Sequence, residues 1–241
     1  MRTPTASEAL GVWERGWGQG YAERGLALLG LARSDMPPDA LADLSVGQRD
    51  GTLLALRETM FGSRIDGCAN CPHCGELMEM SFSTSDLHIG APSDPGLTLQ
   101  VGNCDVTLRL LTSRDLLALK QQEGDDPRRY LLSRCVLLAT VDGEPADAAA
   151  LPPAVVDAVT EALANADPQA DVKLSIPCAA CGHPWHAPFD ILTYLWTELD
   201  AWAKRTLREV HVLASAYGWR EDDVLALSPA RRKLYLDMVG P

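Results

Sequence analysis

Two stretches decide the fold of this chain, Cys71-Pro72-His73-Cys74-Gly75 and Cys178-Ala179-Ala180-Cys181-Gly182. Each is a pair of cysteines separated by two residues and followed at once by glycine. Two thiolates on one tight turn supply half of the four soft ligands that a tetrahedral Zn²⁺ takes, and the glycine permits a positive φ where the turn closes. Together the stretches predict one zinc site per chain, with Cys71, Cys74, Cys178 and Cys181 as its ligands.

A zinc ion bound by these cysteines would be structural. A catalytic zinc keeps one coordination position for water, and four cysteines leave none. The 103 residues between Cys74 and Cys178 form a long loop, but the entropy of closing a loop grows only slowly with its length. Structural zinc contributes about 10–16 kcal/mol in small peptides, enough to close the chain around an inserted segment. Four residues near the pairs could replace a cysteine ligand: Cys68, His73, His183 and His186.

Other roles of cysteine pairs fit the sequence less well. Disulfide frameworks belong to secreted proteins, whereas this chain has seven cysteines and no apolar signal stretch near Met1. A thiol-disulfide oxidoreductase places its cysteine pair where a strand turns into a helix. The residues after Gly75 instead alternate like a strand, which disfavours this role. A thiol-disulfide oxidoreductase is therefore kept only as an alternative function.

The composition describes an acidic globular protein. Of the 241 residues 46% are hydrophobic, and no apolar run reaches the roughly 18 residues of a membrane span. The net charge is −12, although residues 201–241 hold seven Lys/Arg and five Asp/Glu, a balance of +2. Because phosphate backbones attract basic surfaces, we expect no nucleic-acid partner; a zinc-ribbon transcription or RNA-associated factor is the second alternative. We expect a cytoplasmic protein with no membrane span and no small-molecule substrate.

Hydrophobic periodicity predicts helices and strands around the two cysteine pairs. Residues 7–20 are expected to form an irregular arm with two tryptophans, because their glycines weaken a helix. Asp50, Arg57 and Glu58 are expected on a solvated helix face, and Cys104 and Cys135 as buried thiols. The predicted helices are 21–33, 38–41, 46–61, 114–122, 127–140, 153–166, 190–217, 221–227 and one from Pro229; the predicted strands are 76–83, 97–101, 104–111, 171–177 and 183–186.

The resulting fold class is α+β. We expect a mainly helical protein in which a four-cysteine zinc ribbon joins N- and C-terminal helices around an inserted small α/β segment. The predicted division is an N-terminal arm and helices over 1–67, the zinc ribbon over 68–189 with its insertion at 75–177, and C-terminal helices over 190–241. No nucleophile elbow, phosphate-binding glycine loop or H-E-x-x-H motif is present, so the sequence predicts a non-enzyme without catalytic residues.

Three groups of residues carry a resemblance to a known family. They are Val46-Gly47-Gln48-Arg49-Asp50 with the following Leu53–Glu58, Cys71-Pro72-His73-Cys74-Gly75-Glu76, and the tail segments 208–219, 223–227, 231–232 and 235–236. With these the chain resembles the baseplate hub assembly proteins (chaperones) of T-even-type phages, and more closely their counterparts encoded with contractile injection systems. The resemblance implies a baseplate component or assembly factor of a contractile tail, with no chemistry of its own.

The resemblance also implies partners among baseplate or hub subunits. The tail is locally basic on an acidic protein, and tryptophans in a glycine-rich arm are typical of interface hot spots. We therefore expect the C-terminal helices, residues 219–241, and the arm at 13–17 to form a partner-binding surface. Its expected residues are Trp13, Trp17, Trp219, Arg231, Arg232 and Lys233.

Overall fold

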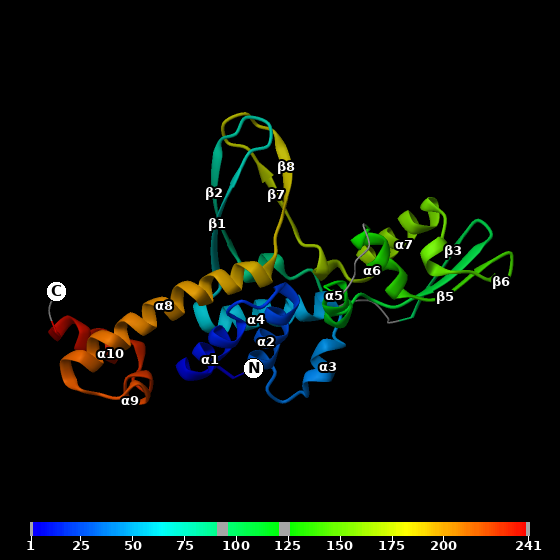
Figure 1. The fold of residues 1–241 in the computed structure, drawn as a ribbon. Coiled ribbons are helices and arrows are strands. Elements are labelled where there is room, and N and C mark those ends of the chain that lie inside the picture. The colour runs from blue at the N-terminus through cyan, green and yellow to red at the C-terminus, as the bar shows by residue number, and fades with distance from the viewer. Residues whose placement is uncertain (1, 91–95, 121–125, 240–241) are drawn as a thin grey trace.

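The computed structural model describes residues 2–90, 96–120 and 126–239 (Figure 1). It is a mixture of helices and small antiparallel sheets, in agreement with the predicted combination of the two. A helical body lies in the middle of the molecule, and its core joins the N-terminal helices to the first half of a long C-terminal helix. The body contains α1 (Ala6–Gly16), α2 (Tyr21–Ala32), α3 (Pro38–Ala42), α4 (Val46–Phe61) and the start of α8 (Ile191–Tyr217).

Helices α4 and α8 begin and end where the sequence predicts. Ser45 and Gln48 form a capping box at the start of α4, and Gly62 ends that helix with φ 88°. Asp190 accepts a hydrogen bond from the Leu192 backbone N–H at the start of α8, and Gly218 ends α8 in the left-handed region. These caps satisfy backbone groups that would otherwise lack partners.

The expectation of an irregular arm over residues 7–20 is wrong, because residues 6–16 form helix α1. Thr5 and Glu8 make a capping box that starts the helix. Gly16 does not weaken it but allows close packing: a Cβ there would lie 2.2 Å from the Trp196 ring. The missing side chain therefore makes room for α8 against α1.

The expectation of a solvated face on α4 is also wrong for Asp50 and Arg57, which are 7% and 3% exposed. The Arg57 guanidinium donates to both carboxylate oxygens of Glu198, at 2.9 and 2.8 Å. Asp50 accepts from Arg49 Nε at 2.7 Å, while burial raises the pKa of Asp50 to about 6. The Arg57 partner lies 141 residues away in sequence, so local periodicity gives no sign of it.

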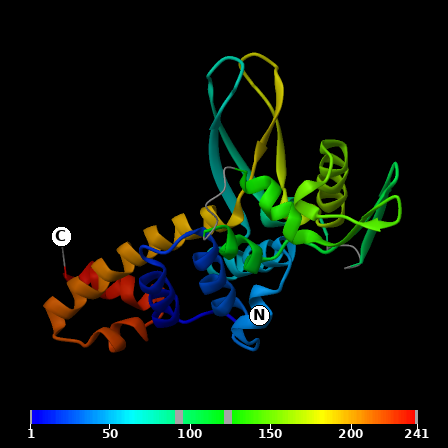
Figure 2. The same cartoon turned by 45° about the vertical axis from the view of Figure 1, so that its right-hand side comes forward.

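Two β-hairpins project together from the helical body as a finger, residues 64–83 and 173–188 (Figures 1 and 2). Each hairpin is a separate two-stranded sheet, and each carries one cysteine pair at its turn. At the base, Phe82 and Phe189 pack edge to face with ring centroids 5.7 Å apart. The strands are β1 (Arg64–Asn70), β2 (Leu77–Ser83), β7 (Lys173–Pro177) and β8 (Pro184–Pro188), of which β1 was not predicted.

The segment between the hairpins forms an insert with its own core. One face of its four-stranded sheet, in the order β3-β4-β5-β6, packs on Val155 and Val159. The predicted helix over 127–140 is wrong beyond Cys135, because residues 136–141 pair with the preceding hairpin as a strand. The insert contains β3 (Leu97–Val101), β4 (Cys104–Leu108), α5 (Ser113–Leu119), α6 (Pro127–Cys135), β5 (Val136–Val141), β6 (Glu144–Pro145) and α7 (Pro153–Ala166).

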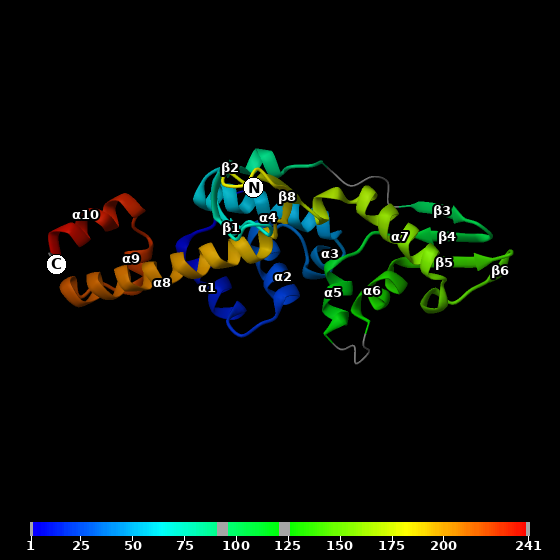
Figure 3. The same cartoon turned by 90° about the horizontal axis from the view of Figure 1, so that it is seen from above.

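The second half of α8 carries a small C-terminal unit with α9 (Glu221–Leu225) and α10 (Pro229–Val239). Val210, Leu213 and Val224 form its buried centre. This unit and the insert lie at opposite ends of an elongated molecule (Figure 3). None of the helices in the described part of the chain is long and apolar enough to cross a membrane.

Candidate metal centre

The two cysteine turns have the same backbone geometry. In the first, Cys71 N–H donates to the Glu76 carbonyl and Gly75 N–H to the Cys71 carbonyl, at 2.8 and 2.9 Å. In the second, Cys178 N–H donates to the His183 carbonyl and Gly182 N–H to the Cys178 carbonyl, at 3.0 and 2.8 Å. Gly75 and Gly182 have φ of 78° and 73°, a region that favours glycine. The glycines thus close both turns as the sequence predicts.

The finger brings the four predicted cysteines together at its tip. The Sγ atoms of Cys71, Cys74, Cys178 and Cys181 all lie within 4.8 Å of one another. Contacts across the two turns measure 3.8 Å from Cys71 to Cys181 and 3.6 Å from Cys74 to Cys178. Four sulfurs about 2.3 Å from a tetrahedral ion lie about 3.8 Å apart. The cluster is therefore positioned to hold a metal ion, and its soft donors suit zinc.

The acid–base properties of the thiols reflect how closely they are packed. The backbone bond from Glu76 favours the Cys74 thiolate, but desolvation and the neighbouring cysteines outweigh it and raise the pKa of Cys74 to about 12. Backbone hydrogen bonds, above all from Cys181, lower the pKa of Cys178 to about 7. Four thiolates cannot share this space without a compensating cation, and a divalent metal supplies one.

The four alternative ligands lie outside the cluster; in the described part of the chain, the group that could hold a metal is the cysteine set alone. Cys68 is exposed on β1, opposite Glu79. The rings of His73 and His183 stack 5.1 Å apart, and His186 lies on β8 opposite Ser175. The stacked imidazoles contact each other and are not part of the cysteine cluster.

The expected partner-binding tryptophans have different environments. Trp13 Nε1 donates to Asp200 at 3.0 Å, and its ring meets that of Trp17 edge on. Trp17 is 61% exposed. Trp219 stacks on Tyr217 and meets Tyr235 edge on. Of the three, Trp17 offers the most surface to a partner.

The expected basic residues of α10 do not all face solvent. Arg231 and Lys233 are exposed, but Arg232 is 4% exposed and its Nε donates to Glu209 at 3.1 Å. Arg232 therefore joins α10 to α8 and is not available to a partner. Consecutive helix positions point about 100° apart, which explains why one of three adjacent cations is buried.

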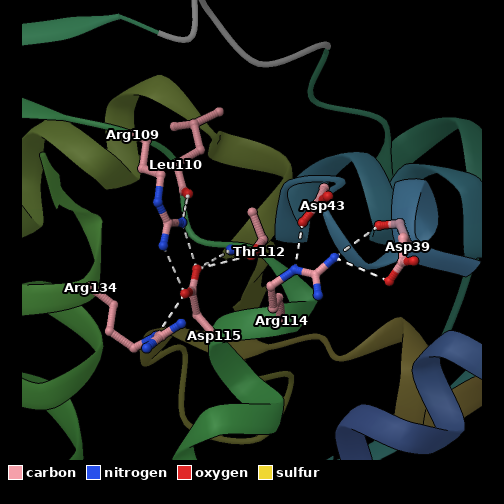
Figure 4. Close-up of polar contacts among 8 residues, drawn as sticks. All are labelled: Asp39, Asp43, Arg109, Leu110, Thr112, Arg114, Asp115 and Arg134. Atoms are coloured by element: carbon pink, nitrogen blue, oxygen red, sulfur yellow. Dashed lines mark hydrogen bonds and ion pairs between the residues drawn. The ribbon is translucent and has the colours of Figure 1, made fainter.

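A buried ionic cluster that the sequence reading missed lies within the insert, at the start of α5 (Figure 4). Asp115, whose side chain is 1% exposed, accepts from Arg109 at 2.7 and 2.8 Å and from Arg134 at 2.8 Å. It also closes a capping box with Thr112 at the start of α5. Desolvation opposes ionisation, but these bonds outweigh it and lower the pKa of Asp115 to about 2. The T-x-x-D spacing at 112–115 was the available signal.

The fold and the cluster define a mixed helix-and-strand protein whose two finger hairpins meet at a potential metal site. The family model described as T4 bacteriophage base plate protein matches residues 34–196, which are 163 of the 241 residues. The chain belongs to this family and is a phage-type baseplate protein. The matched range contains both cysteine pairs, whereas the tail segments of the sequence resemblance lie beyond it. No curated protein and no solved structure matches the chain.

Proposed function

We propose that this chain is a non-catalytic baseplate component or assembly factor of a phage-like contractile tail or injection system. In this proposal one structural zinc ion, bound by Cys71, Cys74, Cys178 and Cys181, fixes the finger. The observation that carries it is the convergence of four sulfurs from two hairpins that are separate sheets. Four thiolate ligands fill a tetrahedral site and leave no position for a water nucleophile.

The zinc would connect the turns of the two hairpins at the tip of the finger. The hairpins are joined at their bases by packing on the helical core, where Phe82 and Leu174 contact the main cluster. No strand of one hairpin pairs with a strand of the other in the described residues. Isolated two-stranded hairpins are marginally stable in water, so a metal at the tip supplies the missing connection between them.

We divide the chain at residues 67/68 and 189/190 by proposed function and not by packing. The main hydrophobic core contains residues from both sides of each boundary, so these boundaries do not separate independent cores. Residues 1–67 would form most of the body, 68–189 most of the metal-bearing finger with its insert, and 190–241 a long helix that completes the body and leads to the partner-binding helices. Trp17, Arg231 and Lys233 would contact another baseplate or hub subunit, with nucleic acid playing no part. Mass spectrometry of purified particles tests whether the chain remains in the assembled tail.

The decisive experiment measures metal content. We expect protein purified without added zinc to contain about one zinc per chain. Cys178→Ser should lose the metal and destabilise the finger, because three thiolates no longer close the site. The matched control is Cys104→Ser, which alters another buried cysteine, 3% exposed in the core of the insert, and should retain the zinc.

Two results would contradict the proposal. The first is a fully folded protein that contains no metal at any stage of purification. The second is a zinc-loaded site with three protein ligands and a bound water, because such a site supports hydrolytic chemistry. Turnover in an insulin-reduction assay that depends on Cys71 and Cys74 would favour the oxidoreductase instead.

A further inference from the structure

Two segments at opposite ends of the long axis, the insert sheet and helix α10, differ in the sign of their charge. The insert sheet and the C-terminal unit lie at opposite ends, with the helical body between them (Figure 3). The sheet segments 97–108 and 136–150 contain four acidic residues and no Lys or Arg, a balance of −4. Helix α10 contains three basic residues and one acidic residue. Because Arg232 is buried against Glu209, the exposed charges are Arg231 and Lys233 against Asp237, a balance of +1.

The acidic end has an open sheet face with an exposed leucine. The face that carries Val106 and Ala139 packs on α7, whereas Leu138 is 57% exposed. Side chains alternate between the faces of a strand, and the register places Asp105 opposite Thr140, two residues from Leu138. Asp105 and Leu138 therefore share the open face.

The turn at the end of this sheet extends the acidic surface. Asp142 and Glu144 lie at the β5–β6 connection and are exposed. The basic Arg129 reaches the segment that follows the sheet, but its guanidinium binds the Ala149 and Leu151 carbonyls. Leu138 thus shares the open face with Asp105, a carboxylate that no cation of the described residues pairs with.

The basic end presents the complementary arrangement. Leu234 and Met238 are 59% and 71% exposed, and their i, i+4 spacing puts them on one face of α10. Arg231 and Lys233 are exposed beside them and have no ion-pair partner in the described part of the chain. The acidic first turn of α9 confines this positive surface to α10.

We propose that the acidic sheet end of one copy of this chain binds the basic α10 end of a second copy, head to tail. The exposed apolar side chains of the two ends would supply the contact area, and the opposite charges would set the orientation and the rate of association. A contact that joined two identical ends would place like charges against each other, so a heterologous interface is favoured. Such an interface generates a closed ring or an open chain, according to the rotation between copies.

This inference rests on the proposed function, which assigns the C-terminal helices to a partner-binding surface. It identifies the partner at that surface as a second copy of the chain. The test uses the full-length, metal-bearing chain. Sedimentation velocity at low ionic strength should show association that increases with concentration and decreases with salt. One variant disables the basic end, Arg231→Glu with Lys233→Glu, and another disables the acidic end, Asp105→Lys with Glu144→Lys. Each should raise the Kd of self-association about tenfold or more.

Mixing the two variants provides the sharpest readout. Each retains one intact end, so an equimolar mixture should form heterodimers although neither variant associates alone. The matched control reverses two exposed charges elsewhere, Arg15→Glu with Glu79→Lys, and should associate like the wild type. Leu138→Ser, which keeps every charge, should also weaken association.

Three outcomes would overturn the proposal: a wild-type chain that stays monomeric at all concentrations, variants that associate normally, or a mixture that remains monomeric. A monomeric chain that still enters particles and binds zinc would remove the head-to-tail contact and leave the proposed function intact. A chain that binds no zinc but still self-associates would contradict the proposed function and leave the head-to-tail contact intact.

Discussion

Gly47 lies in the first turn of α4, where three distant parts of the chain meet. Its N–H donates to Asp167 Oδ2 at 2.8 Å, and the preceding Val46 N–H donates to the Leu111 carbonyl at 2.8 Å. The connection between β4 and α5 and the C-terminal end of the insert are thereby attached to donors that a helix N-terminus leaves free. A Cβ on Gly47 would lie 1.9 Å from Asp167 Oδ1, so only glycine permits this approach.

Gly47→Ala is therefore expected to lower the free energy of unfolding by more than about 2 kcal/mol, because Asp167 must move from a buried position. Gly51→Ala is the matched control one turn later. A Cβ there would meet its nearest atom at 3.9 Å, and alanine favours a helix over glycine by up to about 1 kcal/mol. Urea denaturation of both variants checks the pair. Equal stabilities would contradict the role assigned to Asp167.

For single residues, the sequence predicts a role correctly where a short, repeated spacing indicates which residues act together. The convergence of the four cysteines follows from the repeated C-x-x-C-G, and Cys104 and Cys135 are buried as expected. Arg57 was missed because Glu198 comes from another helix. Arg232 was missed because helix rotation directs it toward Glu209 while its neighbours stay exposed.

At the scale of elements, α5 depends on Asp115 as both a cap and an ion-pair partner. Asp115→Ala removes the capping box and leaves Arg109 and Arg134 without their carboxylate. We expect a loss of about 3–5 kcal/mol in the stability of the insert, the range for breaking a buried pair. Since the folded-state pKa of Asp115 is about 2, this contribution is fully present above its ordinary pKa near 4 and is lost as pH falls toward 2.

Arg114→Ala provides the control for the Asp115 prediction on the same helix. Arg114 pairs with Asp43 and Asp39 at the surface, with 47% of its side chain exposed (Figure 4), and exposed pairs contribute about 0–1 kcal/mol. Urea denaturation at pH 7 and pH 3 separates the two variants. An Asp115 variant no less stable than the Arg114 variant at pH 7 would refute the structural role.

Elements were predicted well where their signals are local. Gly62, Asp190 and Gly218 define helix ends through caps that involve neighbouring residues. Strand β5 was taken for the end of a helix because its pairing with β4 is long-range, and β1 was missed although β2 was found. Helix α1 was missed because the glycines of residues 7–20 were weighed and the T-x-x-E capping signal at Thr5 was not.

At the scale of the molecule, the body, the insert and the C-terminal unit each have a hydrophobic cluster, while the finger has a cysteine cluster at its tip. Helical segments of the body bury leucines such as Leu53, Leu195 and Leu199 completely. Their stability therefore does not depend on the tip. The strands of the finger are mostly exposed or half-buried along their length, so their upper part depends on what joins the two turns.

Removing the metal should therefore release the finger and spare the body. Hydrogen exchange under reducing conditions, with and without a chelator, should show faster exchange in peptides from 64–83 and 173–188, because each hairpin alone is marginal. Peptides from α4 and from the first half of α8 should change little, since their amides are protected by the leucine core. Cys104→Ser should respond like the wild type, and Cys178→Ser should show the released finger before any chelator is added. Unchanged exchange in the finger would show that packing at its base suffices, whereas loss of protection throughout α4 would mean that the metal holds the whole fold.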